Sequence, residues 1–222
     1  MSYKYELHCH TASVSMCGKV EPERIVDLHR EHGYNGIVLT DHYSELTFYK
    51  RHLFAPQKET EFFLAPYRRL LEYCEGTDFT VLLGVELRFY AHAADFLIYG
   101  IDEDFLYNCG NMMLWNGVRL RREVHKAGGL VFQAHPFRGY ILGRNHLVID
   151  GVEVFNGKNS REANEKAKAW AQKYGKLVSS GSDFHREEHI GKGGIITETP
   201  IKTNSDLVNI LKSGDFRLVE NY

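Results

Sequence analysis

Apolar residues along the chain form short runs that alternate with longer amphipathic stretches. Short apolar runs are typical of buried strands, whereas apolar residues that recur every three or four positions are typical of helices. We therefore predict strands at residues 3–10, 36–40, 80–85, 95–100, 130–132, 151–155, 177–178 and 195–196. We predict helices at residues 21–32, 59–75, 111–127, 161–174 and 205–212, with Asn159 or Ser160 as the cap of the fourth.

The alternation of strands with helices is typical of parallel βαβ units, and hence of a doubly wound sheet or a barrel. The chain has 222 residues, a length that suits one domain. Its sequence contains no linker-like tract, low-complexity segment or internal repeat. We therefore expect one α/β domain over residues 1–222.

The overall charge is close to neutral, because the chain has 27 Lys and Arg residues and 29 Asp and Glu residues, which gives a formal net charge of −2. Hydrophobic residues make up 43% and charged residues 25%, which is the balance of an ordinary globular protein. Such a charge gives no reason to expect a basic surface that binds nucleic acid. The unusual feature is the 12 histidines, against only 4 cysteines and 4 methionines.

Nothing in the sequence indicates export or membrane insertion. Residues 1–6 lack the basic start and apolar core of a signal peptide, and no apolar run approaches the roughly 18 residues of a membrane-spanning helix. The cysteines are widely spaced and form no CxxC pair. We expect a cytoplasmic protein with reduced thiols and no membrane partner.

Metal-binding residue types follow five of the predicted strands. In barrels and open parallel sheets, the carboxyl ends of the strands are where ligands bind. Residues two apart on a strand share a face, so a His-x-His or Asp-x-His pair can point into one cavity. The residues in question are His8 and His10, Asp41 and His42, Glu86, His135, and Asp183 and His185.

Imidazole and carboxylate ligands without thiolates favour Zn, Mn or Fe in a catalytic site over a structural zinc finger. The sequence therefore predicts a metal site at these strand ends. Five other histidines have no such context, and we expect them at the surface: His29, His32, His52, His125 and His146. His92 and His189 lie close in sequence to the predicted site and stay unassigned.

Together these motifs resemble the PHP superfamily, the polymerase and histidinol phosphatase domain. The family marks are an HxH start, a TDH, a glutamate after a third strand, an HP and a terminal DxH, and all of them occur here in order between His8 and Gly194. The resemblance implies a distorted (β/α)7 barrel with two or three divalent metal ions at the carboxyl ends of its strands. Seven strands suit this chain length better than the roughly 250 residues of an eight-stranded barrel.

The resemblance also implies how the ligands are shared. The first metal would be bound by His8, His10, Glu86 and Asp183. Glu86 would bridge to a second metal that His135 also binds. A third site would include His42 and His185. Asp41 would not bind the metal itself but would orient one of the ligands by a hydrogen bond.

Two positions depart from the family pattern. Many relatives have a histidine on the strand after the bridging glutamate, and here Asp95 stands at that position, with His92 as the alternative ligand. Relatives with a third metal tend to have a His or Asp shortly after the HxH pair, where this chain has residues 13–17. Cys17 could ligate there, but we interpret it first as an ordinary thiol, which leaves the number of metals at two or three.

The implied activity is hydrolysis of a phosphate ester, with a metal-activated water as nucleophile. His42 or His185 would donate the proton to the leaving group. Three carboxylates against two or three divalent ions give a net positive pocket, which suits a small anionic phosphorylated substrate. Arg138 is the first candidate to bind the phosphate, because its planar guanidinium can contact two oxygens. Further candidates on the same rim are Lys158, Arg161 and Asn156.

Three alternatives share these residues. A nuclease acting on nucleic-acid ends fits the family, but the net charge and the lack of a Lys/Arg-rich face argue against it. A metal-dependent amidohydrolase uses a similar site, and a metal-bearing domain without chemistry is a third alternative. The sequence leaves open the substrate, the metal and the oligomeric state.

Overall fold

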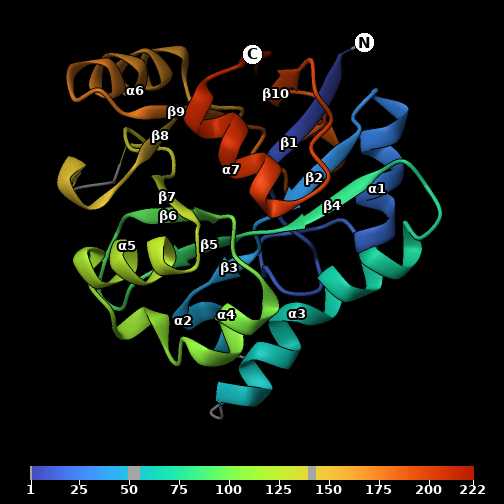
Figure 1. Cartoon of the computed structure of the whole chain (residues 1–222), viewed down its shortest axis with the longest axis horizontal. Coiled ribbons are helices and arrows are strands. Elements are labelled where there is room, and N and C mark those ends of the chain that lie inside the picture. Colours follow the sequence, from blue (N-terminus) through green and yellow to red (C-terminus); the bar gives the residue numbers. More distant parts are fainter. Residues whose placement is uncertain (1, 50–55, 140–143) are drawn as a thin grey trace.

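The computed structural model describes residues 2–49, 56–139 and 144–222, and it confirms a mixed α/β fold (Figure 1). His52, which we expect at the surface, lies outside these residues. The strands form two sheets, with the orders β11-β10-β1-β2-β4 and β3-β5-β6-β7-β8-β9. Most predicted strands and helices are present, with ends shifted by a few residues.

The first sheet consists of β11 (Phe216–Glu220), β10 (Gly193–Thr197), β1 (Tyr3–Cys9), β2 (Gly36–Leu39) and β4 (Thr80–Leu83). The second consists of β3 (His42–Tyr43), β5 (Val85–Arg88), β6 (Asp95–Tyr99), β7 (Leu130–Gln133), β8 (Gly151–Asn156) and β9 (Leu177–Gly181). The α-helices are α1 (Pro22–Glu31), α2 (Glu45–Tyr49), α3 (Pro56–Tyr73), α4 (Glu103–Asn108), α5 (Gly117–Lys126), α6 (Arg161–Lys173) and α7 (Asn204–Ser213).

The two sheets are linked by hydrogen bonds near the carboxyl ends of their strands. On one side, Glu86 N–H donates to the carbonyl of Asp41 at 3.1 Å. On the other side, His10 N–H donates to Phe184 O and Phe184 N–H donates to His8 O, each at 2.9 Å. The pairing therefore gives two sheets that are linked on both sides, and it brings the predicted site segments to one end of the molecule.

The expectation of parallel βαβ units does not hold at β6, which runs antiparallel to both β5 and β7. The connection from Arg88 to Asp95 is too short for the dozen or more residues of a crossover helix, so the chain reverses directly. β10 and β11 are also antiparallel to their neighbours.

The predicted helix at 111–127 is interrupted. Residues Met112–Leu114 form a 3₁₀ turn, and α5 starts only at Gly117. Asn116 has extended backbone angles, and its side chain accepts a hydrogen bond from Arg119 N, so it caps a new helix. For the helix at 161–174, Ser160 is the cap, since its hydroxyl accepts from Ala163 N at 3.2 Å.

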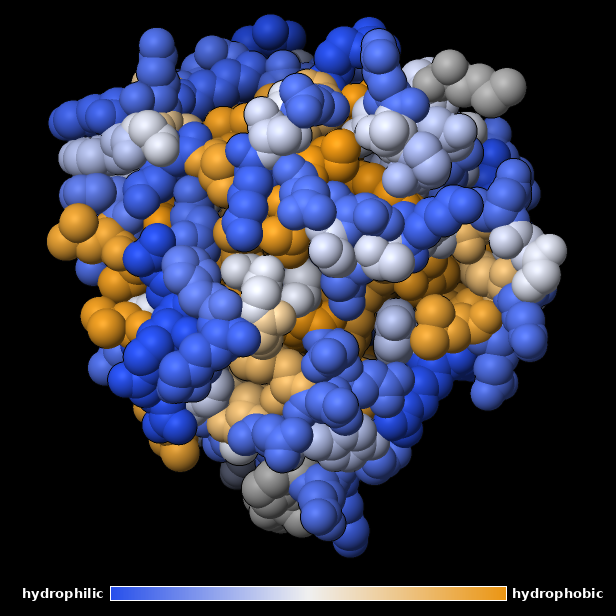
Figure 2. Space-filling view, in the orientation of Figure 1, coloured by the Kyte–Doolittle hydropathy of each residue, from blue (hydrophilic) through white to orange (hydrophobic). Residues whose placement is uncertain are grey.

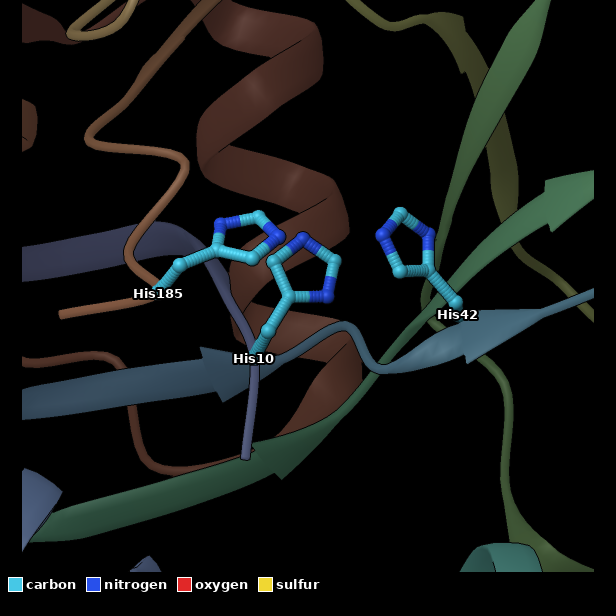
Figure 3. A group of neighbouring side chains, drawn as sticks. All are labelled: His10, His42 and His185. Carbon is cyan, nitrogen blue, oxygen red and sulfur yellow. The ribbon is translucent and has the colours of Figure 1, made fainter. Parts of the chain in front are cut away.

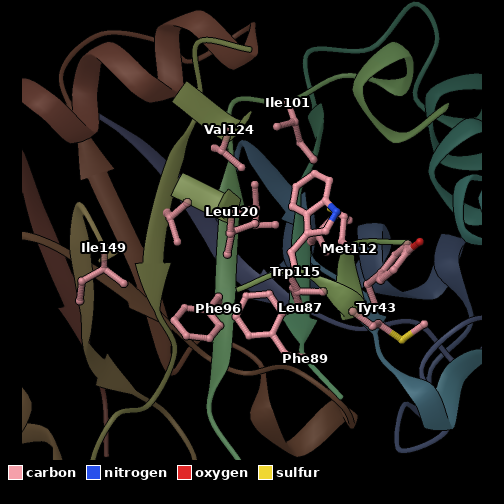
Figure 4. Close-up of a cluster of buried hydrophobic side chains, with 14 of the residues drawn as sticks. Tyr43, Leu87, Phe89, Phe96, Ile101, Met112, Trp115, Leu120, Val124 and Ile149 are labelled. Carbon is pink, nitrogen blue, oxygen red and sulfur yellow. The ribbon is translucent and has the colours of Figure 1, made fainter. Parts of the chain in front are cut away.

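Two of the buried apolar clusters join elements that are distant in the sequence. In the larger one, Leu87 and Phe96 pack with Trp115 and Leu120 (Figure 4). The second joins strand residues from both sheets to α7, which packs beside Gly100 at the end opposite the predicted site. Hydrophilic side chains cover most of the face in Figure 2. Among the described residues, no helix is both long and apolar enough to cross a membrane.

The expectation of a surface position is wrong for His29, which is fully buried. Its Nδ1 donates to the carbonyl of Ile25 at 2.7 Å, and its Nε2 lies 3.9 Å from a carboxylate oxygen of Glu6. His125 is partly exposed as expected, but it pairs with Asp150 at 2.8 Å. Helical spacing alone could not reveal the buried carboxylate that His29 faces, because Glu6 belongs to β1.

Candidate metal centre

The structure brings all eight predicted metal-binding residues together at the linked ends of the two sheets. Seven of them are buried, and only the side chain of His42 is partly exposed, at 21%. Their ligand atoms fall into overlapping groups whose members lie within 4.8 Å of one another. The residues are His8, His10, His42, Glu86, Asp95, His135, Asp183 and His185.

One set of facing ligand atoms comes from His8, His10, Glu86 and Asp183. Glu86 Oε2 lies 3.4 Å from His8 Nε2 and 3.3 Å from His10 Nε2. Asp183 Oδ1 lies 3.6 Å and 3.5 Å from the same two nitrogens. Tetrahedral ligands at ordinary zinc–nitrogen or zinc–oxygen bond lengths are separated by roughly 3.3–3.6 Å, so these spacings fit one ion.

The hydrogen bonding of this group also fits a metal. Four of its buried atoms have no hydrogen-bond partner within the described ranges: His8 Nε2, His10 Nε2, Glu86 Oε2 and Asp183 Oδ1. A buried polar atom without a partner costs free energy, so native structures rarely keep several at one place without a ligand for them. The group therefore has the right donor atoms, facing one another, for a divalent cation.

The other ring nitrogen, Nδ1, is hydrogen-bonded in both His8 and His10. His8 Nδ1 contacts Glu153 Oε1 at 2.7 Å, and since a carboxylate only accepts, the imidazole donates. His10 Nδ1 contacts Ser15 Oγ at 3.2 Å, while the Ser15 hydroxyl donates to Asp41 Oδ1 at 2.7 Å. Both contacts leave Nε2 as the nitrogen with a lone pair, which is the arrangement that metal-binding histidines use.

Asp41 lies next to Ser15, the residue that contacts His10 Nδ1. Besides Ser15, its carboxylate accepts hydrogen bonds from the backbone N–H and the hydroxyl of Thr11, at 2.8 and 2.7 Å. Ser15 Oγ in turn accepts from the backbone N–H of His42 at 2.9 Å. Burial raises the pKa of Asp41 to about 6, although these hydrogen bonds oppose the rise.

A second group shares Glu86. The other oxygen of Glu86, Oε1, lies 2.9 Å from His135 Nε2, which is 3.8 Å from Asp95 Oδ2. Glu86 thus faces both groups, one with each oxygen. His92 stays outside them, since it is exposed and its Nδ1 accepts from Ala94 N. Asp95 also forms a two-pronged ion pair with Arg88, at 2.6 Å for each contact.

The third group consists of His10, His42 and His185, whose rings lie close together (Figure 3). The centroid of the His10 ring is 4.3 Å from that of His42 and 4.2 Å from that of His185. His42 also contacts Glu86 Oε2 through Nδ1 at 2.7 Å. His189, unassigned from sequence, accepts a hydrogen bond from the backbone N–H of His185 at 3.1 Å.

The electrostatics of the centre favour positive charge. Burial alone would lower the pKa of His8, but Glu153, Glu86 and Asp183 raise it well above the ordinary value. Burial would raise the pKa of Asp183, yet the neighbouring histidines hold it well below the usual range. The carboxylates are therefore ionised and require compensating charge, which protonated imidazoles or divalent cations can provide.

Local backbone distortions aim the side chains into the centre. His135 and Asp183 have φ angles of 27° and 52°, in a region that non-glycine residues seldom adopt and that tends to occur at functional sites. The pairing register also shifts after Glu6 in β1 and after Glu153 in β8. Such bulges redirect side chains beside active sites.

A cavity of about 290 Å³ opens over the centre. Arg138 and Lys158 line it, as expected, and so does Arg88, which the sequence pattern does not single out. Arg138 pairs with Asp183 Oδ2 at 2.6 Å and also donates to Asn156. Arg161 is not brought to the cavity: it begins α6 and lies over the ring of Tyr222, 4.1 Å from its centroid.

Two buried carboxylates at the centre are absent from the sequence expectations. Glu153 accepts from His8 and, through Oε2, from the backbone N–H of His135 at 2.9 Å. Glu6 Oε1 accepts from the N–H groups of His8 and Ser182, each at 2.9 Å. Both lie inside apolar strand runs, and a carboxylate in such a run is the signal that could have indicated them.

Comparisons with known proteins agree with this architecture. A family model described as PHP-associated matches residues 161–216. A 3',5'-nucleoside bisphosphate phosphatase of Chromobacterium violaceum is 38% identical over 78 residues, which are 31% of this chain and 26% of that protein. The match thus spans about a quarter of the length of the curated relative.

Two solved structures resemble the whole chain. One is a two-domain protein containing a predicted PHP-like metal-dependent phosphoesterase from Bacteroides vulgatus, with a TM-score of 0.76, 16% identity and coverage of 100% of this chain and 65% of that one. The other is the lesion-specific endonuclease PfuEndoQ from Pyrococcus furiosus, with a TM-score of 0.64, 15% identity and coverage of 98% and 58%. These likenesses show the fold, and with the sequence matches they confirm the resemblance to the PHP superfamily.

Proposed function

We propose that this PHP-like chain is a metal-dependent hydrolase that releases phosphate from a small phosphorylated molecule. The observation that carries the proposal is the group of His8, His10, Glu86 and Asp183, whose facing ligand atoms lie beneath a cavity with cationic walls. The similarity to a bisphosphate phosphatase supports phosphate esters as the substrate class and favours a nucleotide-like molecule.

We also propose that the two linked sheets act as one distorted (β/α)7 arrangement over residues 1–222. Taking β2 with β3 and β4 with β5 as single positions, the strand order has seven positions from β1 to β9. The hydrogen bonds of Phe184 to His8 and His10 join the last position to the first.

At least two divalent ions, of Zn, Mn or Fe, would be bound. His8, His10, Glu86 and Asp183 would hold one, and Glu86, His135 and Asp95 the other. Nitrogen and carboxylate donors suit these metals. When bound, such ions acidify a water for attack on phosphorus and neutralise the phosphoryl oxygens.

The protein groups bind the phosphate and handle protons. Arg138 and Lys158 reach the same wall of the cavity, since both contact Asp183 Oδ2, at 2.6 and 3.6 Å. Both cations also line the cavity, where they can contact the phosphate oxygens of a substrate. His42 and His185 stay our candidates for donating a proton to the leaving oxygen, and Lys158 Nζ lies 3.4 Å from His185 Nδ1.

The test combines metal analysis with phosphate release from a panel of monoesters, bisphosphates, diesters, oligonucleotides and amides. We expect at least two ions per chain after reconstitution and release from a small phosphomonoester or bisphosphate. The His8→Ala variant should lose activity while keeping its circular-dichroism spectrum. Fewer than two ions together with no phosphate release from any substrate would refute the proposal.

A nuclease activity is the second candidate, because the similar structure of PfuEndoQ belongs to an endonuclease. The present chain has a net charge of −2, and its cavity is small for a nucleic-acid strand. Cleavage of oligonucleotides with kcat/KM above that for mononucleotides would favour this candidate over phosphatase activity.

A further inference from the structure

Two exposed apolar side chains, Met16 and Leu46, line the cavity over the metal centre. Met16 is 42% exposed and Leu46 is 56% exposed, and neither belongs to the groups of metal-binding residues. A single apolar side chain at the surface is common and needs no explanation. Two of them on the wall of one cavity, beside a centre of imidazoles and carboxylates, leave apolar surface that a ligand can cover.

Met16 lies on a loop that is fixed on both sides of it. Before it, the hydroxyl of Ser15 donates to Asp41 Oδ1 at 2.7 Å. After it, the backbone N–H of Lys19 donates to the carbonyl of His185 at 2.8 Å. Because the backbone is already ordered, a ligand that contacts Met16 costs little conformational entropy of the loop.

Leu46 lies in the first turn of α2, which is also bonded to the centre. Its neighbour Thr47 donates through Oγ1 to the carbonyl of His42 at 2.8 Å. The backbone N–H of His42 in turn donates to Ser15 Oγ at 2.9 Å. The segments that carry Met16 and Leu46 are therefore joined to each other, so the two apolar side chains belong to one side of the cavity.

The cations proposed to bind the phosphate come from other strands. Arg138 follows β7 and Lys158 follows β8, which lies next to one edge of the second sheet, whereas β3, which precedes Leu46, forms the opposite edge. Arg88, a third cation on the wall, is paired with both oxygens of Asp95. The cavity of about 290 Å³ is close to the lower end of the roughly 300–1,000 Å³ of small-molecule sites. It thus suits one small molecule with an anionic end and an apolar end.

We propose that Met16 and Leu46 bind the leaving group of the substrate and select molecules in which that group carries a planar ring of nucleobase size. The inference rests on the proposed phosphatase function. Covering apolar surface is favourable in water, and a methionine sulfur makes additional favourable contacts with aromatic rings. A sugar phosphate without a ring of this kind would place hydroxyl groups against Met16 and Leu46, so it binds more weakly.

Two substrates with the same ester group isolate the contact with the ring. A nucleoside 5'-monophosphate and ribose 5-phosphate release phosphate from the same type of primary alcohol, so the ratio of their kcat/KM values reports binding of the base. We expect this ratio to fall about tenfold in Met16→Ser and in Leu46→Ser, because apolar contacts in a pocket discriminate by about that factor. Met16→Leu, which keeps the apolar surface, should retain the ratio. Leu147→Ser is the matched control, since Leu147 is 72% exposed and is not among the residues that line the cavity.

The methyl resonance of Met16 gives a readout that does not depend on hydrolysis. Protein with ¹³C-labelled methionine methyl groups is loaded with Zn²⁺ and titrated with a phosphonate analogue of the nucleotide, which the enzyme cannot hydrolyse. The ring current of a bound base should shift the Met16 resonance. The resonances of Met112 and Met113, which are buried in the core, should stay in place. The phosphonate analogue of ribose 5-phosphate, which has no ring current, is the control ligand.

Three results would each overturn the inference: equal kcat/KM for the nucleotide and ribose 5-phosphate, an unchanged ratio in both serine variants, or a Met16 resonance that does not respond to the nucleotide analogue. If phosphate release persists in these cases, the proposed phosphatase function stands and only the contact with the ring fails. A protein that releases phosphate from no ester fails both proposals.

Discussion

Glu153 Oε1 accepts a hydrogen bond from His8 Nδ1 at 2.7 Å, although 145 positions separate the two residues. The same carboxylate accepts from the backbone N–H of His135 through its second oxygen. One buried side chain of β8 thereby orients a residue from each of the first two metal groups. It fixes the tautomer in which His8 presents Nε2 to the centre.

Replacing Glu153 should therefore weaken metal binding without removing a ligand. Partners that orient metal-binding histidines typically contribute about 10- to 100-fold in metal affinity. We expect a loss of that size in Glu153→Gln, measured by competition with a chromogenic chelator. Glu165→Gln, on the exposed face of α6, is the control. Equal affinities for the two variants would contradict the orienting role.

Arg138 and Arg161 make a matched pair for substrate binding, because only the first lines the cavity. Lysine cannot reproduce the forked contact of arginine with two phosphate oxygens. We expect Arg138→Lys to raise KM about tenfold, equivalent to about 1.4 kcal/mol of binding free energy. Arg161→Lys should leave KM unchanged. A comparable change in both variants would mean that Arg138 does not contact the substrate.

Gly18 tests the rigidity of the loop that carries Cys17. A methyl group there would collide with the carbonyl of Thr11, and such overpacking costs about 1–3 kcal/mol. We expect Gly18→Ala to lower the free energy of unfolding by this amount in urea titrations. At Gly139, an added methyl group would meet no atom of the described residues within 4 Å, so Gly139→Ala should change stability by less than about 0.5 kcal/mol. Equal stability of the two variants would show that the loop can relax.

The capping box of α7 gives a prediction about pH away from the centre. Thr203 Oγ1 accepts from Asp206 N, and the Asp206 carboxylate accepts from the backbone N–H of Lys202 and Thr203. These hydrogen bonds lower the pKa of Asp206 in the folded state, and the bond from the backbone N–H of Lys202 has the largest effect. Its contribution to stability is therefore complete above the unfolded-state pKa of about 3.9 and is lost as the pH falls through the lower folded-state value.

We expect Thr203→Ala to cost about 1 kcal/mol at pH 7. Asp206→Asn should reduce the difference in thermal stability between pH 7 and pH 3. Asp215→Asn, at an exposed position just after the same helix, should leave that difference as in the wild type. If the Asp206 and Asp215 variants respond to pH alike, the capping box is not the cause.

The sequence determined the placement of metal-binding residue types at strand ends, because the hydrophobic period locates strands and the polar residue after each run marks its end. It thereby indicated His8, His10, Glu86, His135 and Asp183 as neighbours, and the structure brings them together. The alternation of strands and helices was likewise sufficient for the α/β class, since that class depends on element order.

Only the tertiary structure decided which partners these residues have. Glu153 and Glu6 lie in apolar strands and accept hydrogen bonds at the centre, and Arg88 forms an ion pair with Asp95 there. No local sequence pattern encodes such contacts between distant segments. The reversal at β6 depends on how a short connection closes in space. The position of Cys17 against His185 depends on a loop held by hydrogen bonds to residues more than a hundred positions away, so sequence spacing could not distinguish an ordinary thiol from a candidate ligand.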